Sequence, residues 1–278
     1  ENRDGVSVRG KSFNVLLDHL SVSWALDENI STSQEGVYDV TFSHSIIAEG
    51  LDRSIHPKGP HSKGVLIGDN SKNISIHHCL FAHNVDRNPR LKAGASAEFI
   101  NNLVYHWGGH GGSNAANVSD PGKSGRPILL NFAGNFYQPG PGSPKAPVLT
   151  GKSLDKFTRI FTVNNIGPSL RSVEDEPAWR ISNLPQTPHQ TLDYALPPSG
   201  IQIKRPEDTY AFVLTHAGMR PARRNSVDRR IIDDVQKNGG SFKNCVSDCL
   251  LNAGGWPVLQ VQHKKFTAPQ SPDSDNDL

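Results

Sequence analysis

The sequence predicts an all-β protein, a right-handed parallel β-helix with short C-terminal helices packed on its outside. Three observations predict it: strand-like segments recur along the chain, each carries a His or Asn at one matching position, and polar, Gly-rich connections of uneven length follow them. No unit can bury its apolar face alone, but stacked units form one continuous core. The alternative is an antiparallel sandwich, which the scarcity of Asn-Gly or Asp-Gly hairpin turns disfavours.

Six segments align on this repeat: NVLLDHLSVS, DVTFSHSIIA, NISIHHCLFA, AEFINNLVYH, LNFAGNFYQ and FTVNNIGPS. The matching polar residues are His19, His44, His78, Asn102, Asn135 and Asn165. Because parallel strands stack about 4.8 Å apart, we expect these side chains to form an internal hydrogen-bonding ladder. Neighbouring residues of a strand point to opposite faces, so we expect His77 to face outward and not to share an ion with His78.

The repeat fades beyond Gly167, which divides the chain. We expect residues 1–167 to form the β-helix core, and residues 168–264 to form a surface excursion rich in Pro and Ser followed by helices. Residues 265–278 read as a disordered acidic tail.

Two helices are expected in the C-terminal part. The first runs from Pro206 to Ala217. The second runs over 226–237, where Asn225 can cap it and Gly239 can end it. Its apolar stripe consists of Val227, Ile231 and Val235.

Composition limits the function classes. The formal net charge is +2, which is too small to suggest nucleic acid as a partner. The sequence contains no run of 18 apolar residues, so we expect no membrane-spanning helix. Three N-x-S/T sequons, at Asn29, Asn73 and Asn117, are compatible with secretion. Among the three cysteines, Cys79 is expected in the core, and Cys245 with Cys249 could form a disulfide.

The most informative segment, residues 74–92, joins an alternating strand to a turn that carries several cations. Arg87, Arg90 and Lys92 then project from a rigid edge, as a polyanionic substrate requires.

Within this segment, HHCLFAHNVDRNPRLK resembles the signature of the pectate lyases of polysaccharide lyase family 1. NVLLDHLSVSW with DENIS, VTFSHSIIAEGL, HSKGVLIG and FINNLVYHWG match in the family's order, and VDRRIIDDV and GGWPVL are similar to the tail of its bacterial-type members. The resemblance implies a pectin lyase-like β-helix that cleaves polygalacturonate by β-elimination. Family members have further coils before the position of Asp4, so we expect this chain to begin at an exposed coil edge.

The resemblance also assigns site residues. Arg87 matches the catalytic arginine of the family, and Lys63 and Lys92 match substrate-binding positions. Arg90 belongs to the same loop and could bind substrate or brace Asp86. Lysine at position 92 keeps the charge of the family's arginine but lacks its bidentate fork.

A calcium site follows from the same resemblance. Asp4 matches the first calcium aspartate and Glu28 a second acidic ligand, while the third acidic position falls near Thr32. Asp27 could take that place if the loop is re-registered. In the family, Ca²⁺ bridges protein and uronate carboxylates and stabilises the carbanion-like transition state.

Arginine is an unusual base, because a guanidinium with a pKa near 13 is only about 10⁻⁴ neutral at pH 9. Arg87 must therefore be perturbed by its surroundings or act mainly as an electrostatic stabiliser, and both predict an alkaline optimum.

The sequence thus predicts a secreted, monomeric, calcium-dependent pectate lyase acting on an acidic polysaccharide, with neither nucleic acid nor a membrane as partner. Two alternatives stay open: a pectin lyase acting on methyl-esterified chains without calcium, and a non-catalytic carbohydrate-binding β-helix.

Overall fold

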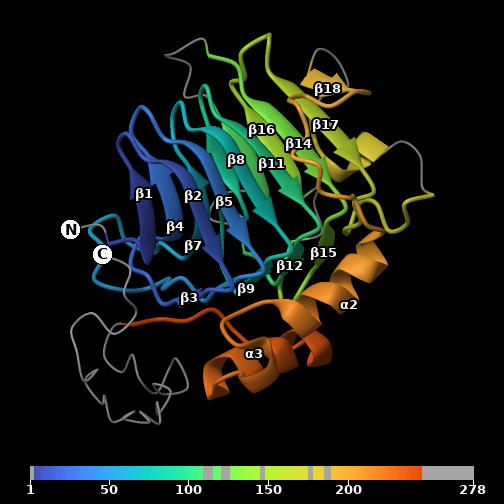
Figure 1. Ribbon diagram of the computed structural model, residues 1–278. Coiled ribbons are helices and arrows are strands. Elements are labelled where there is room, and N and C mark those ends of the chain that lie inside the picture. Colours follow the sequence, from blue (N-terminus) through green and yellow to red (C-terminus); the bar gives the residue numbers. More distant parts are fainter. Residues whose placement is uncertain are drawn as a thin grey trace, which may run out of the picture.

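The computed structural model describes residues 3–108, 115–119, 126–144, 148–174, 178–184 and 189–245. In this part of the chain, each of the first five coils contributes one strand to each of three parallel sheets in turn, and β16, β17 and β18 extend two of these sheets (Figure 1). The predicted right-handed parallel β-helix is therefore confirmed.

Three sheets, named here A, B and C, form the walls of the helix. Sheet A contains, in stacking order, β1 (Val6–Arg9), β4 (Glu28–Ser33), β7 (Lys63–Ile67), β10 (Arg90–Lys92), β13 (Ala116–Ser119) and β16 (Leu149–Lys152). Sheet B contains β2 (Phe13–Asp18), β5 (Tyr38–Ser43), β8 (Lys72–His77), β11 (Ser96–Ile100), β14 (Leu129–Ala133), β17 (Arg159–Val163) and β18 (Gln190–Thr191). Sheet C contains β3 (Ser21–Ser23), β6 (Ile46–Ala48), β9 (Leu80–Ala82), β12 (Leu103–Tyr105) and β15 (Phe136–Gln138).

The core lies between the sheets and is built by alternation. Successive residues of a strand face opposite sides, so equivalent positions of stacked strands bury similar side chains. Phe99 pairs in register with Ile76 and Phe132, and its ring stacks on that of Phe132 with the centroids 5.6 Å apart. This apolar column of sheet B holds the coils together, and it belongs to the same core as the inward residues Ile30, Val65 and Leu91 of sheet A.

The predicted ladder of His and Asn residues is wrong in its membership. The turn from sheet B to sheet C has two consecutive positions, and the sequence alignment combined residues of both in one row. The first holds residues with positive φ: His19, His44, His78, Asn101, Gly134 and Asn164. The second holds Leu20, Ser45, Cys79, Asn102, Asn135 and Asn165. The first position demands the left-handed region, which His, Asn and Gly tolerate best.

An internal ladder does form at the second position. The side-chain amide of Asn102 donates to Asn135 Oδ1 over 3.2 Å, and that of Asn135 donates to Asn165 Oδ1 over 2.9 Å. Each amide oxygen also accepts a backbone N–H from the preceding coil, as Asn102 Oδ1 does from Cys79. Cys79 itself is fully buried, as predicted.

The histidines form a separate stack at the first position. The rings of His19 and His44 stack with centroids 4.9 Å apart, and those of His44 and His78 with centroids 5.1 Å apart. The prediction that His77 and His78 point apart is wrong, because their Nδ1 atoms lie 2.9 Å from each other. Strand alternation ends at His77, and the positive φ of His78 turns its ring back toward His77.

Two α-helices cover the outer face of sheet C (Figure 1). They are α2 (Pro206–His216) and α3 (Ser226–Lys237), with the short 3₁₀ turn η2 (Pro221–Arg223) between them. The predicted stripe of α3 is buried, and Asn225 accepts the backbone N–H of Asp228 as its cap. Asn238, not Gly239, is the left-handed residue that ends α3. No helix in the described ranges has the length and apolarity to cross a membrane.

The sheets continue beyond the predicted boundary at Gly167. Strand β18 pairs with β17, and an isolated bridge joins Leu149 to Ser182 next to the 3₁₀ turn η1 (Ala178–Ile181). The division into core and excursion stays a prediction, and the predicted tail over 265–278 lies outside the described residues. Cys245 is disulfide-bonded, whereas Cys249 also lies outside them.

Candidate functional site

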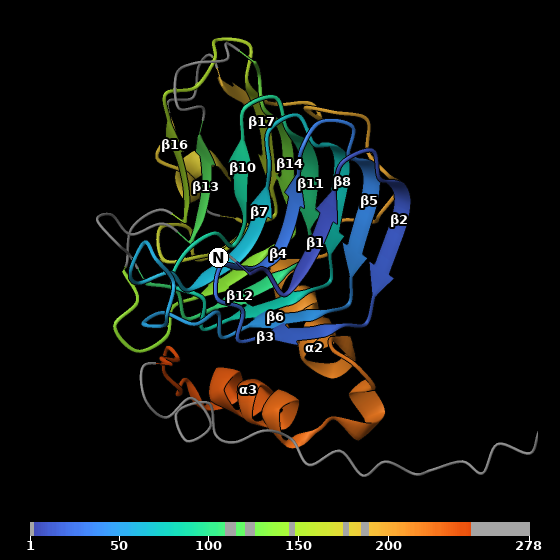
Figure 2. The ribbon, with the colours of Figure 1, turned by 90° about the vertical axis from the view of Figure 1, so that its left-hand side faces the viewer.

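A groove crosses the outer face of sheet A, whose strands lie side by side in Figure 2. It encloses about 330 Å³ and is lined almost entirely by polar and charged side chains: Asp4, Arg9, Asp27, Glu28, Ser31, Ser33, Lys58, Leu66, Arg87, Arg90 and Lys92. Six of the seven residues predicted for the site line it, and Lys63 does not.

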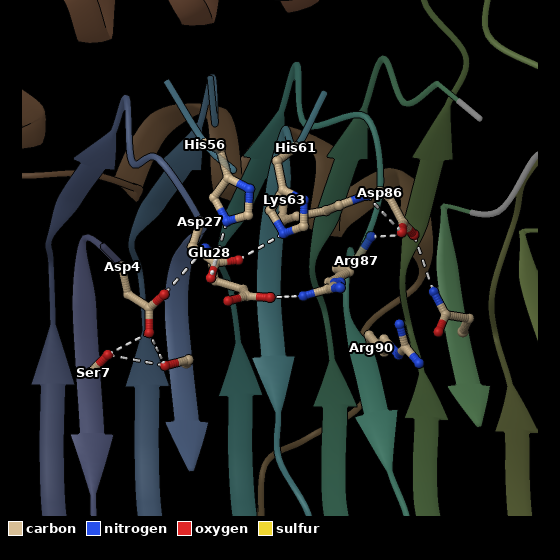
Figure 3. Close-up of polar contacts among 12 residues, drawn as sticks. Asp4, Ser7, Asp27, Glu28, His56, His61, Lys63, Asp86, Arg87 and Arg90 are labelled. Carbon is tan, nitrogen blue, oxygen red and sulfur yellow. Dashed lines mark hydrogen bonds and ion pairs between the residues drawn. The ribbon is translucent and has the colours of Figure 1, made fainter. Parts of the chain in front are cut away.

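Three carboxylates converge at one end of the groove (Figure 3). Asp4, Asp27 and Glu28 each offer an oxygen, and these atoms lie within 4.8 Å of one another. Asp4 precedes β1, and Asp27 and Glu28 lie where β4 begins, so neighbouring coils bring them together. Three clustered negative charges repel one another unless a cation or donors offset them.

Hydroxyl groups hold Asp4. Its Oδ2 accepts hydrogen bonds from Ser7 Oγ and Ser31 Oγ, each with an O–O distance of 2.5 Å. Its Oδ1 accepts a hydrogen bond from the backbone N–H of Glu28 at 3.3 Å. Ser7 and Ser31 pair in register on β1 and β4, which aims both hydroxyls at one carboxylate.

Two histidines hold Asp27. The Nε2 of His61 lies 2.8 Å from Asp27 Oδ1, and the Nε2 of His56 lies 3.6 Å from Oδ2. Both rings are buried and stack with centroids 3.9 Å apart. The backbone N–H of Lys58 donates to His56 Nδ1, so the ring proton of neutral His56 sits on Nε2 and faces Asp27. Burial lowers the pKa of His61, so at neutral pH this ring is a neutral partner for the carboxylate.

Glu28 differs from its two neighbours, because its partner is the guanidinium of Arg87 (Figure 3). The side chain of Glu28 is 5% exposed and that of Arg87 15%. The predicted catalytic residue and a predicted metal ligand therefore form a sheltered ion pair.

Thr32 is not a ligand position. It pairs in register with Val8 and Ile67 on the inner side of sheet A, and its hydroxyl donates to Ser71. Alternation places Ser31, not Thr32, toward the carboxylates. The acid expected there is absent because the position faces the core, and Asp27 stands at the cluster instead.

The backbone of Arg87 is fixed by local contacts. Its φ is +64°, its N–H donates to Asp86 Oδ1 over 2.7 Å, and its C=O accepts from Val65 N–H over 2.6 Å. Burial, with Arg90 nearby, lowers the pKa of Arg87 to about 10. A lowered pKa makes the neutral guanidine more accessible at alkaline pH than it is for a solvated arginine.

Lys63 lies behind the groove rather than in it. It is buried on β7, and its ammonium forms an ion pair of 3.2 Å with Asp86 Oδ2. Asn117 donates to the other oxygen of Asp86. Asp86 is thus braced by Lys63 and Asn117, and not by Arg90 as the sequence left open.

Arg90 and Lys92 form the middle of the groove floor on β10. Arg90 donates to Ser119 Oγ over 3.0 Å, and its Nε is buried without an acceptor among the described residues. Lys92 pairs with Asp69 at the surface. Both cations face the same groove as Arg87, as the sequence predicted.

Sequence reasoning missed His56 and His61 as the partners of Asp27. The segment HPKGPHSKG carried a signal, since two histidines and three glycine or proline residues precede the Lys63 motif in a connection too short for regular structure.

No protein-family model matches this chain. Individual curated proteins, however, are similar to it in sequence. A "Probable pectate lyase C" of Aspergillus flavus is 30% identical over 229 residues, which are 81% of this chain and 49% of that protein. Its counterpart from Neosartorya fischeri is 31% identical over 227 residues, again 81% of this chain and 49% of that protein.

This chain is a relative of the pectate lyases. It spans about half the length of the curated relatives that it matches. The counterpart from Aspergillus terreus extends the match to 88% of this chain at 29% identity. The resemblance found in the sequence motifs therefore holds over most of the chain.

Proposed function

We propose that this protein is a calcium-dependent pectate lyase that cleaves de-esterified homogalacturonan by β-elimination. The observation that carries the proposal is the juxtaposition, in one groove, of three carboxylates with Arg87, Arg90 and Lys92. A neutral substrate requires neither charge, whereas a polyuronate and its counterion require both.

The donor set fits calcium. Three carboxylates with oxygens within 4.8 Å, on neighbouring coils, match the oxygen-rich coordination that Ca²⁺ prefers. Glu28 Oε1 is buried, and in the described residues its partner is the guanidinium of Arg87. When bound, the ion would act as a Lewis acid toward the uronate carboxylate. Asp4, Asp27 and Glu28 would hold it.

The chain's own residues would orient the substrate and move the proton. Arg90 and Lys92 would bind uronate carboxylates along the floor. Arg87 would face the C5 proton, either accepting it as a neutral guanidine or stabilising the charge that develops on its loss. Lys63 stays a proposed substrate contact, and it must leave Asp86 to serve as one.

The leaving oxygen and the C5 proton depart from adjacent carbons, so the product carries a new C4–C5 double bond. That bond conjugates with the uronate carboxylate and absorbs ultraviolet light, which supplies the assay.

Cleavage of polygalacturonate, followed by that absorbance with EDTA and then with excess CaCl₂, tests the proposal. We expect EDTA to abolish the product and calcium to restore it. Cleavage of highly methyl-esterified pectin in EDTA would instead identify a pectin lyase. Binding of polygalacturonate without any absorbance would identify a carbohydrate-binding module, and either result would overturn the proposal.

We also propose that the protein is secreted and acts as a monomer. Its polymeric substrate is extracellular, and of the three sequons Asn73 begins on an exposed part of β8. Asn29 is fully buried and cannot carry a glycan in the folded state. Mass determination of the secreted protein before and after deglycosylation, with its mass in solution by light scattering, tests both points.

A further inference from the structure

Glu28 has two competing roles, as a ligand of the proposed cation and as the ion-pair partner of Arg87. The proposed function needs it as a cation ligand beside Asp4 and Asp27, yet in this structure it pairs with Arg87. The same function needs Arg87 free to face substrate. A guanidinium engaged by a buried carboxylate presents less positive charge and fewer donors to a uronate.

We propose that Glu28 is a calcium-released latch on Arg87: without the cation it holds the guanidinium, and the cation draws Glu28 away and frees Arg87 for the substrate. This inference rests on the proposed function, and it adds an order to it, cation before productive substrate binding.

The other two carboxylates cannot serve as the latch. In the described part of the chain, Asp4 is held by two serine hydroxyls and a backbone N–H, and Asp27 by two histidine rings. Those partners hold the carboxylates in place while leaving their charge uncompensated. Among the three, in the described part of the chain, Glu28 is the one that forms an ion pair with Arg87, whereas Asp4 and Asp27 act on Arg87 through charge attraction without such a pair.

The exchange requires movement of side chains only. Arg87 is anchored by its N–H on Asp86 and its C=O on Val65, and Glu28 by β4, where it pairs in register with Lys63. The Nε of Arg87 is buried without an acceptor, so the described residues leave part of the guanidinium unpaired.

Charge balance favours such an exchange. A buried charge stripped of its partner is costly, so Glu28 and Arg87 stabilise each other while cation and substrate are absent. When both ligands are present, the cation neutralises Glu28 and a uronate carboxylate neutralises Arg87. In both states Glu28 and Arg87 each face an opposite charge.

The decisive variant is Glu28→Gln, which has the same shape but no charge to hold Arg87. Binding of trigalacturonate is measured by calorimetry in EDTA, so no calcium-loaded enzyme is involved. Wild type should bind weakly, and Glu28→Gln about tenfold more tightly, the gain from one released charge-assisted contact. The gain should disappear in Glu28→Gln/Arg87→Gln.

Asp4→Asn is the matched control, because it removes the same charge from the same cluster without touching Arg87. An equal gain in Asp4→Asn, a gain that survives in the double variant, or no gain in Glu28→Gln would each overturn the latch. Circular dichroism confirms that the variants fold.

A second measurement does not need the Glu28 variant. In a calcium titration, Arg87→Gln should bind the ion more tightly than Arg90→Gln, because both lose one cation from the groove but only Arg87 competes for Glu28. Equal affinities would also overturn the latch. If wild type fails to bind trigalacturonate even with calcium, the proposed function fails instead.

Discussion

The turn from sheet B to sheet C and the groove on sheet A both carry polar side chains in register from coil to coil. In the turn, the groups satisfy one another: Asp18 accepts from Ser43 and lies 2.6 and 3.0 Å from His19 and His44, and the asparagines donate along the ladder. In the groove, like charges converge instead. Three carboxylates lie together, and two arginines have buried Nε atoms without acceptors among the described residues.

The comparison gives a criterion for telling structural rows of side chains from functional ones in a repeat protein. The same solenoid geometry aligns both sets, so alignment alone does not mark a site. A row whose donors and acceptors balance stabilises the stack, whereas a row with surplus charge is prepared for an external ligand. Four predictions test that distinction, from the largest expected effect to the smallest.

Arg87→Ala should lower kcat on polygalacturonate by at least about 10²-fold, because a donor at the developing charge acts mainly in the transition state. Arg87→Lys should fail nearly as badly, since lysine lacks the planar fork. Steady-state kinetics by ultraviolet absorbance measure both. Arg90→Ala is the control and should mainly raise KM. If Arg87→Ala kept its kcat and only raised KM, Arg87 would be a binding residue.

Asn135→Leu should destabilise the fold by about 2–4 kcal/mol, because Asn102 N–H and Phe99 C=O would lose their buried partner. Chemical denaturation measures the free energy of unfolding. Asn73→Gly removes an exposed amide–carboxylate contact with Asp39 while tolerating the φ of +52° at this position, and it should change the free energy of unfolding by no more than about 0.5 kcal/mol. Similar losses of unfolding free energy in both variants would mean that the buried ladder stabilises the fold no more than an exposed hydrogen bond does.

The histidine stack should make stability depend on pH. Burial lowers the pKa of His77 to about 4 and that of His78 to about 3. Between pH 6.5 and those values the unfolded chain binds protons that the folded chain does not, so stability should fall as pH falls through this window.

His78→Asn should flatten this pH dependence by about 2 kcal/mol between pH 7 and pH 4. Asn101 holds the same turn position one coil later with a φ of +55°, so asparagine fits the backbone there. Unfolding measured at both pH values in wild type and variant checks this. Parallel pH profiles would show that His78 is not the responsible group.

The smallest effect is expected for the outlying cations on the outer face of sheet A. Arg9, Lys92 and Lys152 each follow a residue of one inward row, Val8, Leu91 and Gly151, so they occupy one outward row across sheet A. Arg9→Ala or Lys152→Ala should raise KM for long polygalacturonate a few-fold while leaving trigalacturonate unaffected, because exposed charges contribute little individually. Lys156→Ala, outside this row, is the control. An equal rise with the trimer would place these cations beside the reacting sugar.

The sequence by itself determined the solenoid, the two C-terminal helices and six of the residues that line the groove. Each depends on local signals: alternating strands, His or Asn at a turn, a capping Asn225, and a motif that brings Arg87, Arg90 and Lys92 onto one edge. These signals survive without tertiary detail because one coil predicts the next.

Only the tertiary structure decided which polar residues meet. Adjacent asparagines at 101–102 and 164–165 made two turn positions look like one, until strand register separated them. Three features depend on contacts between residues of different coils. They are the inward orientation of Thr32, the contact of two histidines with Asp27 and the pairing of Glu28 with Arg87. Contacts across coils depend on connection lengths and side-chain directions, which a linear pattern does not encode.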